Sequence, residues 1–299
     1  MSGELLSICI PTYNRASFLK ELLETFSRQI QESNLTSNDV EFYISDNASV
    51  DTTPEVVKAF ERHGFSTTYS RNPANIGVSR NLLRVCAMAR GSYWWTLGDD
   101  ERICEKALVN ILHTLRREKP GLLLAFDSDY PFPPLPVPQV FLDYPAFARA
   151  CLQLNNPYPI ADQTLLSCNI FRGDCYDPVS AEQNVGTFLP HMYGMMRLLI
   201  QKRAPVVLPD FPIITVRKSD RGGPRDGVWP DIDACWIQYL KWLRDEMRMP
   251  ELDPAGPTRI ARRRMFQTIL SNPFGYFHKN WRVFFQPSAY RCFFSRLFR

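Results

Sequence analysis

Two adjacent carboxylates, Asp99 and Asp100, follow a short aromatic run of the chain and are the first candidates for chemistry. Neither immediate neighbour, Gly98 nor Glu101, is basic, so the two like charges repel each other unless a cation lies beside them. Carboxylate oxygens, together with substrate phosphates, are typical ligands of Mg²⁺ and Mn²⁺. The pair therefore indicates a divalent-metal site at which charge on a departing diphosphate would be neutralised. The alternative is a solvated acidic turn that caps the next helix.

Three further polar segments could join this pair. Residues 11–15 read Pro-Thr-Tyr-Asn-Arg, residues 46–51 read Asp-Asn-Ala-Ser-Val-Asp, and residues 75–81 read Asn-Ile-Gly-Val-Ser-Arg-Asn. The first two follow short apolar runs, and the third opens a helical pattern. Asp51 stands before Thr-Thr-Pro-Glu, which is more typical of a helix N-cap than of a ligand.

Alternating apolar strands and amphipathic helices must position these residues. Residues 5–10 form an almost wholly apolar run that stops at Pro11, as a buried parallel strand would. Residues 16–30 then repeat large apolar side chains at helical spacing. The expected strands are 5–10, 40–45, 66–70, 93–97, 122–126, 164–171 and 206–207. The expected helices are 16–30, 78–89, 107–117, 188–201 and 232–248, and a further helix is expected to open at 51–55.

This alternation predicts an α/β fold in which an open, mostly parallel sheet carries helices on both faces. Ligands of such sheets bind beyond the carboxyl ends of the strands. Because the polar segments stand at those ends, we expect them to line one edge of the sheet. Residues 130–138 contain five prolines and are expected to form an extended loop.

The order and spacing of the four motifs resemble the nucleotide-sugar-binding half of the inverting glycosyltransferases of family 2. The resemblance rests on strand-PTYNR-helix, strand-DNASVD-helix, NIGVSRN, and an aromatic strand that ends in paired aspartates. It implies the GT-A fold, a Rossmann-like and mostly parallel sheet flanked by helices. It also implies a metal-dependent transfer of a sugar from a nucleotide-sugar donor to a hydroxyl acceptor.

The resemblance also implies roles for individual residues. Asp46 would accept a hydrogen bond from the nucleobase, Asp100 would ligate Mn²⁺ or Mg²⁺, and Asp99 would approach the ribose. Family members often carry a leading Asp where this chain has Gly98. The other residues that the resemblance places against the nucleotide sugar are Pro11, Thr12, Tyr13, Arg15, Asn75 and Arg80.

The base that removes the proton of the acceptor hydroxyl has two candidates. Family members commonly carry a Glu-Asp pair at the start of a helix well after the metal motif, and this chain has none there. His191 stands about where that Asp would be, and Glu182 is the second candidate. Imidazole and carboxylate groups can both act as a general base. The alternative for His191 is a purely structural role at the head of a helix.

The C-terminal segment 259–299 differs in composition from the rest of the chain. It holds nine basic residues, eleven aromatic residues and no Asp or Glu, so its charge is +9 within a total of +4, which leaves −5 for residues 1–258. Aromatic side chains interleaved with arginine suit short helices in the interface of an anionic membrane. The alternatives are packing on the body or on a second subunit, and binding of single-stranded nucleic acid. The acidic body disfavours nucleic acid as a partner, and nothing in the sequence indicates the oligomeric state.

Three regions follow from these observations: a nucleotide-sugar-binding half at 1–120, an acceptor-binding half at 121–257 and a membrane-associating extension from 258 to 299. Eight cysteines without a C-x-x-C pair suggest reduced thiols in the cytoplasm. Neither a signal peptide nor an apolar run of membrane-spanning length is evident. We therefore expect a cytoplasmic enzyme, peripheral on the inner face of the cell membrane.

With a membrane-bound location, the acceptor is expected to be a lipid-linked glycan in bacterial surface-polysaccharide synthesis. A nucleotidyltransferase is a rival interpretation, but PTYNR lacks the Gly-rich basic signature that such an enzyme favours after its first strand. A non-catalytic scaffold at the membrane surface, with a degenerate GT-A fold, is the second rival. Gly98 and the missing Glu-Asp pair point toward it.

Overall fold

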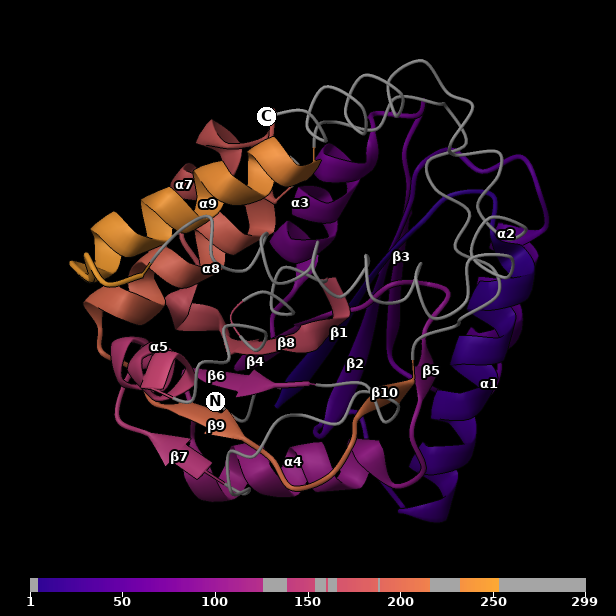
Figure 1. The fold of residues 1–299 in the computed structure, drawn as a ribbon. Coiled ribbons are helices and arrows are strands. Elements are labelled where there is room, and N and C mark those ends of the chain that lie inside the picture. The colour runs from indigo at the N-terminus through magenta and orange to yellow at the C-terminus, as the bar shows by residue number, and fades with distance from the viewer. Residues whose placement is uncertain are drawn as a thin grey trace, which may run out of the picture. The chain divides into compact units, whose positions relative to one another are not determined.

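A computed structural model describes residues 5–125, 139–153, 160, 166–187, 189–215 and 232–252. Residues 1–252 belong to one compact unit (Figure 1). Its strands are β1 (Leu6–Thr12), β2 (Val40–Asp46), β3 (Thr67–Arg71), β4 (Tyr93–Thr96), β5 (Arg102–Ile103), β6 (Leu122–Leu124), β7 (Gln139–Phe141), β8 (Asn169–Arg172), β9 (Val206–Leu208) and β10 (Ile214–Thr215). Its helices are α1 (Ala16–Glu32), α2 (Thr53–Glu61), α3 (Val78–Met88), α4 (Ala107–Glu118), α5 (Tyr144–Gln153), α7 (Pro178–Gln183), α8 (Pro190–Gln201) and α9 (Ile232–Met247), and the 3₁₀ turns are η1 (Leu166–Cys168) and η2 (Gly173–Cys175).

Eight of the strands form one sheet in the order β3-β2-β1-β4-β8-β6-β9-β7. The strands β3, β2, β1 and β4 are parallel to one another, and β6 is parallel to β9. Only β8 and β7 run antiparallel to the strands beside them within this sheet. The expected mostly parallel α/β sheet is therefore confirmed, with β8 and β7 as its antiparallel strands.

Helices cover both faces of the sheet, because the buried strands present apolar side chains in both directions. Leu6, Ile8 and Ile10 of β1 pack into the core that includes α1, α2 and α4. Cys9, which points to the other face, packs with Val85 of α3. Figure 1 shows α1 and α4 on one side of the sheet and α3, α8 and α9 on the other.

The strand β1 runs two residues further than expected, through Pro11 to Thr12. Its pairing with β4 ends at Cys9, whose carbonyl accepts a hydrogen bond from the amide of Leu97 at 2.9 Å. The backbone nitrogen of Pro11 faces the β4 side of the strand, as the backbone of Cys9 does. The pairing with β4 has already ended there, so the missing N–H of Pro11 costs no strand hydrogen bond. Pairing with β2 continues to Thr12 opposite Asp46.

Several elements were not expected. The strand expected at 164–171 begins only at Asn169, since the 3₁₀ turn η1 takes up residues 166–168. The strands β5, β7 and β10 have only two or three residues, too few to show an alternation of apolar and polar side chains in the sequence. The helices α5 and α7 follow Asp143 and Asp177, whose side chains accept backbone N–H bonds at the helix starts. The proline-rich loop and the C-terminal extension lie outside the described residues.

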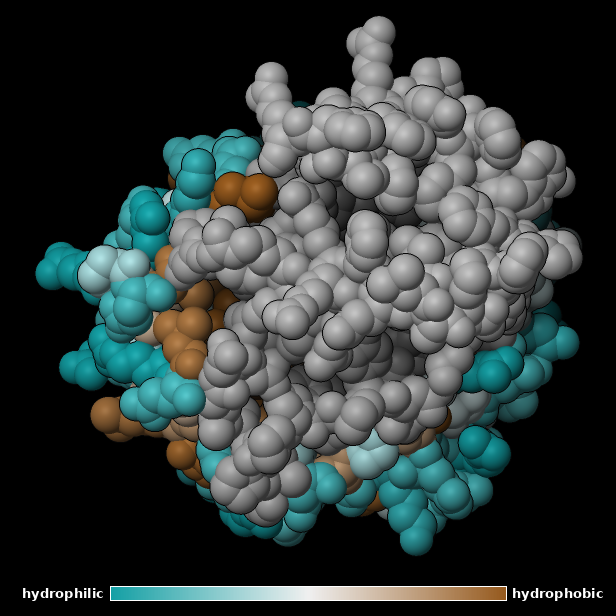
Figure 2. All heavy atoms as spheres, viewed as in Figure 1, coloured by the Kyte–Doolittle hydropathy of each residue, from teal (hydrophilic) through white to brown (hydrophobic). Residues whose placement is uncertain are grey.

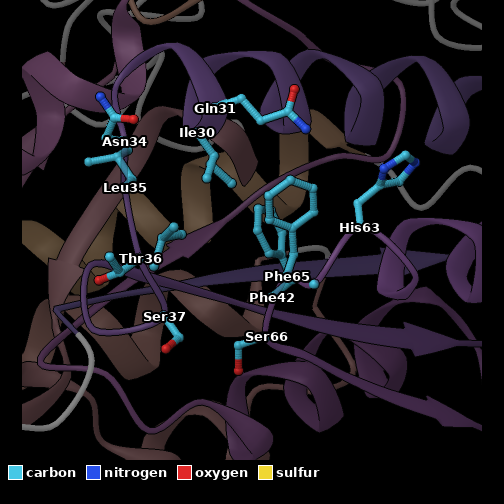
Figure 3. A pocket seen from close by; sticks show the side chains of 12 residues that line it. Ile30, Gln31, Asn34, Leu35, Thr36, Ser37, Phe42, His63, Phe65 and Ser66 are labelled. Carbon is cyan, nitrogen blue, oxygen red and sulfur yellow. The ribbon is translucent and has the colours of Figure 1, made fainter.

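A pocket of ≈ 500 Å³ lies at the amino ends of β2 and β3 (Figure 3). Its lining includes Ile30, Phe42, His63 and Phe65. The carboxyl ends of the same strands carry the predicted site, so this pocket is at the opposite edge of the sheet. No helix among the described residues is both long and apolar enough to cross a bilayer. On the face seen in Figure 2, the described residues are mostly hydrophilic, and apolar side chains gather where α5, α8 and α9 lie in Figure 1.

Candidate functional site

Strand register brings two predicted residues, Thr12 and Asp46, into one row at the carboxyl edge of the sheet. Thr12 pairs with Asp46 across β1 and β2, and Asp46 pairs in turn with Arg71 across β2 and β3. The hydroxyl of Thr12 donates a hydrogen bond of 2.7 Å to Asp99, which follows β4. Residues far apart in the chain therefore meet at this edge, as expected from the parallel arrangement.

Arg15 supplies the cation that the paired carboxylates require. Its Nη1 atom lies 3.0 Å from Oδ1 of Asp99 and 2.9 Å from Oδ2 of Asp100, so one nitrogen bridges both side chains. The positive charge lowers the repulsion between the two carboxylates. The sequence predicted a cation beside this pair, and in the structure Arg15, from the loop after β1, provides one.

Asp99 is the more buried member of the pair, with 4% of its surface exposed, against a half-buried Asp100. Burial raises the pKa of Asp99 to about 6, although Arg15 and the hydroxyl of Thr12 favour the charged form. Asp100 adds a further, smaller rise in this pKa. The more exposed carboxylate, Asp100, is therefore better placed to meet a ligand from solvent.

The donor set fits a divalent cation only when a ligand completes it. Within the described ranges, no cluster of three or more His, Cys, Asp or Glu side chains could hold a metal ion. Two carboxylates plus substrate phosphates are a common set for Mg²⁺ or Mn²⁺. Asp99 and Asp100 fit that pattern if Arg15 moves from between them as the phosphates arrive.

Asp46 is fully buried at the end of β2 and accepts hydrogen bonds on both oxygens. The amide of Ser49 donates to Oδ1 at 2.8 Å, and the hydroxyl of Tyr69 donates to Oδ2 at 2.7 Å. Nε of Arg71 lies 3.6 Å from the same Oδ2. The last two residues were not among the sequence candidates, although both stand on the strand next to Asp46.

A network of asparagines fixes the loop before α3. Asn47 donates from its amide to Oδ1 of Asn75 at 2.8 Å, and its own Oδ1 accepts from the amide of Ile76 at 2.9 Å. The Oδ1 of Asn75 also accepts from the amide of Gly77, whose φ of 85° lies in the left-handed region. Asn75 therefore shapes this loop and so orients α3, which carries Arg80.

The N-cap position expected for Asp51 belongs to Thr52, but the carboxylate of Asp51 still caps two helices by accepting their first amides. Its Oδ1 accepts from the amide of Thr53 at 3.1 Å, at the start of α2, and its Oδ2 accepts from the amide of Ala16 at 3.0 Å, at the start of α1. Burial alone would raise the pKa of Asp51, but the hydrogen bonds from Thr53 and Ala16 lower it. One charged side chain thus joins the loop that carries Arg15 to the loop that follows Asp46.

The two candidate bases have different surroundings. Glu182, at the end of α7, is exposed and forms an ion pair with Arg80 at 3.1 Å. This pair borders a hollow of ≈ 310 Å³ on the surface of α3. His191, in the first turn of α8, is buried, and neither of its ring nitrogens has a hydrogen-bond partner among the described residues. Burial lowers the pKa of His191 to about 4.

The structure therefore joins Thr12, Arg15, Asp99 and Asp100 directly, with Asp46 adjoining Thr12 in the sheet. Pro11 lies in β1 beside them, and Tyr13, just after β1, is 41% exposed. Arg80 is brought against Glu182 instead.

Comparison with known proteins gives the family. The model of "Glycosyl transferase family 2" matches residues 7–171, which is more than half of the chain. Abequosyltransferase RfbV of Salmonella typhimurium is 28% identical over 265 residues, covering 81% of this chain and 75% of the relative. Validoxylamine A glucosyltransferase of Streptomyces hygroscopicus subsp. jinggangensis is 46% identical, but over 57 residues only, 19% of this chain and 13% of the relative.

The fold is shared with a solved structure of lower sequence identity. TarS 1–349 of S. aureus superposes with a TM-score of 0.57 at 15% identity, covering 84% of this chain and 67% of that one. The same protein has been solved in complex with UDP-GlcNAc, with a TM-score of 0.57 at 16% identity and coverages of 84% and 68%. The expected GT-A fold is thereby confirmed. With the family model spanning the ordered motifs and the sheet edge on which they meet, the chain belongs to glycosyl transferase family 2 and is a glycosyltransferase.

Proposed function

We propose that this chain transfers a sugar, with inversion, from a nucleoside diphosphate donor to a hydroxyl of a lipid-linked glycan in bacterial surface-polysaccharide synthesis. The observation that carries the proposal is the cluster of Thr12, Arg15, Asp99 and Asp100 beside Asp46. It joins two carboxylates and a guanidinium at the edge of the sheet where such folds bind ligands. The abequosyl transfer named for the Salmonella relative and the UDP-GlcNAc bound to TarS support a sugar-nucleotide donor.

Asp100 and Asp99 would hold Mn²⁺ or Mg²⁺ together with the donor phosphates. The metal ion would neutralise negative charge on the departing nucleoside diphosphate. Arg15, released from the two carboxylates, would remain beside the phosphates, where a guanidinium forms strong charge-assisted hydrogen bonds. Pro11, Thr12 and Tyr13 would line the nucleotide from the end of β1.

The reaction needs one proton transfer. The acceptor oxygen bonds to the anomeric carbon on the face opposite the diphosphate, the bond from that carbon to the diphosphate oxygen breaks, and a base takes the hydroxyl proton. We propose His191 as this base, with Glu182 as the alternative. With a pKa of about 4, His191 is neutral at pH 7, but the burial that lowers this pKa also disfavours the imidazolium that proton transfer would form. Glu182 would first have to leave Arg80.

The segment 259–299 is proposed to hold the enzyme at the inner face of the cell membrane. Its +9 charge and eleven aromatic residues support this assignment. Attraction to anionic lipid is about 1 kcal/mol for each basic residue near the surface. A glycan acceptor carried on lipid would then lie in the same plane as the enzyme.

Donor binding and its metal dependence are tested by thermal unfolding with UDP, CDP, GDP or ADP, each with and without Mn²⁺. We expect at least one nucleotide to raise the Tm more with Mn²⁺ than without it. A ligand at 100 times its Kd adds about 2.7 kcal/mol to the free energy of unfolding. Asp100→Asn should abolish the Mn²⁺-dependent increment, whereas Asp245→Asn, on the exposed surface of α9, should keep it. No stabilisation by any nucleotide would favour the non-catalytic scaffold.

The base is tested by turnover of the single variants His191→Ala and Glu182→Gln. General bases contribute roughly 10²- to 10⁴-fold to a rate. We expect His191→Ala to lower kcat within that range and Glu182→Gln, at an exposed ion pair, to lower it by less than 10-fold, that is about 1.4 kcal/mol. A large loss in Glu182→Gln alone would assign the base to Glu182. Near wild-type turnover in both variants would refute both assignments.

The buried imidazole predicts a particular pH dependence of stability. Since the pKa of His191 falls from 6.5 to about 4 on folding, the unfolded chain takes up this proton first as the pH drops. The free energy of unfolding should therefore decrease between about pH 6.5 and pH 4, by up to about 3 kcal/mol. Urea unfolding of His191→Gln across this range should lack that part of the decrease. His63→Gln, at an exposed residue, should follow the wild-type curve, and identical curves for all three proteins would contradict the prediction.

Membrane binding is tested by flotation of the full chain with anionic and with neutral vesicles. We expect recovery with anionic vesicles only, and a loss of about 100-fold in affinity when Arg262–Arg264 are all replaced by Gln, at about 1 kcal/mol each. A matched triple replacement of Arg28, Arg62 and Arg90, exposed on the body, should bind like wild type. Equal recovery of both triple variants would exclude the proposed role of the segment.

A further inference from the structure

A serine from the antiparallel part of the sheet, Ser167, reaches the turn that carries the paired carboxylates. The strand β8 runs antiparallel to β4, with Ile170 opposite Trp95. Continued by three residues on each chain segment, this register sets Ser167 beside Gly98, the residue directly before the two aspartates. Ser167 lies in the 3₁₀ turn η1 and is buried. It therefore meets a turn that stands 69 residues earlier in the chain.

The hydroxyl of Ser167 binds both ends of that turn. Its Oγ accepts a hydrogen bond from the amide of Gly98 at 3.1 Å and donates one to Oε1 of Glu101 at 2.9 Å. Gly98 and Glu101 flank Asp99 and Asp100 in the sequence. A hydroxyl has a single proton, so it acts here once as a donor and once as an acceptor. One buried side chain thus fixes the backbone before the pair and the side chain after it.

Ser167 is itself held in place by β4. The indole nitrogen of Trp95 donates to the carbonyl of Ser167 at 2.9 Å, and the hydroxyl of Thr96 donates to the carbonyl of Leu166 at 2.9 Å. Trp95 and Thr96 are both buried. A buried donor that loses its partner is costly, so η1 cannot leave the end of β4 without a penalty. The hydroxyl of Ser167 is therefore presented to the turn from a fixed position.

The absence of a side chain at Gly98 makes this close approach possible. A Cβ atom at this residue would lie 3.2 Å from Oδ1 of Asp100, 3.4 Å from Cγ of Glu101 and 3.5 Å from Oγ of Ser167. The first of these distances is shorter than an ordinary van der Waals contact, so a larger residue would displace the carboxylate of Asp100. Gly98 and Ser167 therefore complement each other in this chain.

We propose that Ser167 is a positioning residue of the donor site: its hydroxyl holds the turn so that Asp99 and Asp100 are already placed for a divalent cation. The same hydroxyl keeps Glu101 apart from the pair, in keeping with the lack of any three-carboxylate cluster among the described residues. The proposal rests on the proposed function, because it requires a metal ion at these carboxylates. Ligands that are in place beforehand spare the ion the cost of ordering them.

The first test compares Ser167→Ala with Ser7→Ala. Ser7 is also buried, and its Oγ accepts from the amide of Gly91 at 2.8 Å, just before β4, so it is a matched control far from the turn. The Kd of Mn²⁺ is measured by electron paramagnetic resonance of free Mn²⁺ in the presence of UDP, CDP, GDP or ADP. Loss of a group that orients metal ligands typically costs 10- to 100-fold in metal affinity. We expect Ser167→Ala to raise this Kd about 10-fold and Ser7→Ala to leave it unchanged.

A metal-free measurement distinguishes positioning from general damage. Titration calorimetry with the same nucleotides and no metal ion gives their Kd in each variant. Because the hydroxyl of Ser167 acts on the carboxylates that would bind the cation, the metal-free Kd of Ser167→Ala should equal that of wild type. A merely structural role of Ser167 would weaken nucleotide binding with and without Mn²⁺ alike.

The second test uses Gly98→Ala, which keeps the hydroxyl of Ser167 and adds a Cβ against the carboxylate of Asp100. We expect this variant to raise the Kd of Mn²⁺ as well, again without a change in metal-free nucleotide binding. Gly186→Ala is its control, since a Cβ there would meet no atom within 4 Å. Circular dichroism and Tm show whether each variant is folded, and Gly98→Ala decides the matter if Ser167→Ala does not fold.

Two outcomes overturn the proposal: a Kd of Mn²⁺ that is unchanged or lower in folded Ser167→Ala, or an equal loss of metal-free nucleotide affinity in that variant. In both cases the donor site of the proposed function stands. If wild-type protein binds a nucleotide but no Mn²⁺ beside it, the metal dependence of the proposed function fails and the role of Ser167 fails with it. If wild-type protein binds none of the four nucleotides, the proposed function itself fails.

Discussion

The contact of one guanidinium nitrogen with two carboxylates is the interaction on which the rest of the site depends. Without Nη1 of Arg15 at about 3 Å from both Asp99 and Asp100, two adjacent negative charges would face each other, one of them almost fully buried. Removal of one partner of a buried ion pair leaves an uncompensated charge, which is strongly destabilising. Arg15 lies just before α1, and Thr12 ends β1. Their contacts with Asp99 and Asp100 therefore connect the start of α1 and the end of β1 to the turn after β4.

The sheet supplies the precision that this contact needs. β1 lies between β2 and β4, and its register sets Thr12 beside Asp46 and close enough to Asp99 for a hydrogen bond of 2.7 Å. The polar side chains stand where apolar strand residues give way to loops, so burial of the strands holds the site together. Differences in exposure then separate their roles: Asp46 and Asp99 are buried, while Asp100 and Arg15 remain partly accessible.

Much of this architecture could be predicted because its signals are local. The apolar runs of β1 and β2 and the helical spacing of α1 were sufficient to place these elements within two residues. The partner of the Asp99–Asp100 pair could not be predicted from neighbours in sequence, since Arg15 is 84 residues from Asp99. Tyr69 and Arg71 were missed for the same reason: on a short strand they look like ordinary edge residues, and only the register with β2 brings them to Asp46. Two unexpected helices did have a signal in the sequence. Asp143 stands directly before α5 and Asp177 directly before α7, and an aspartate is a typical residue at a helix start.

The double cap at Asp51 has a mechanical consequence. Its carboxylate bonds the first amides of α1 and α2, and Asn14 and Ser49 link the same two loops through hydrogen bonds of 2.8 Å from the amides of Val50 and Asn14. A loss of such a cap costs about 0.5–2 kcal/mol, so neither loop can shift alone without that penalty. The loop that carries Arg15 and the loop that follows Asp46 therefore move as one rigid unit, so local adjustment at this edge of the sheet is left to side chains such as Arg15.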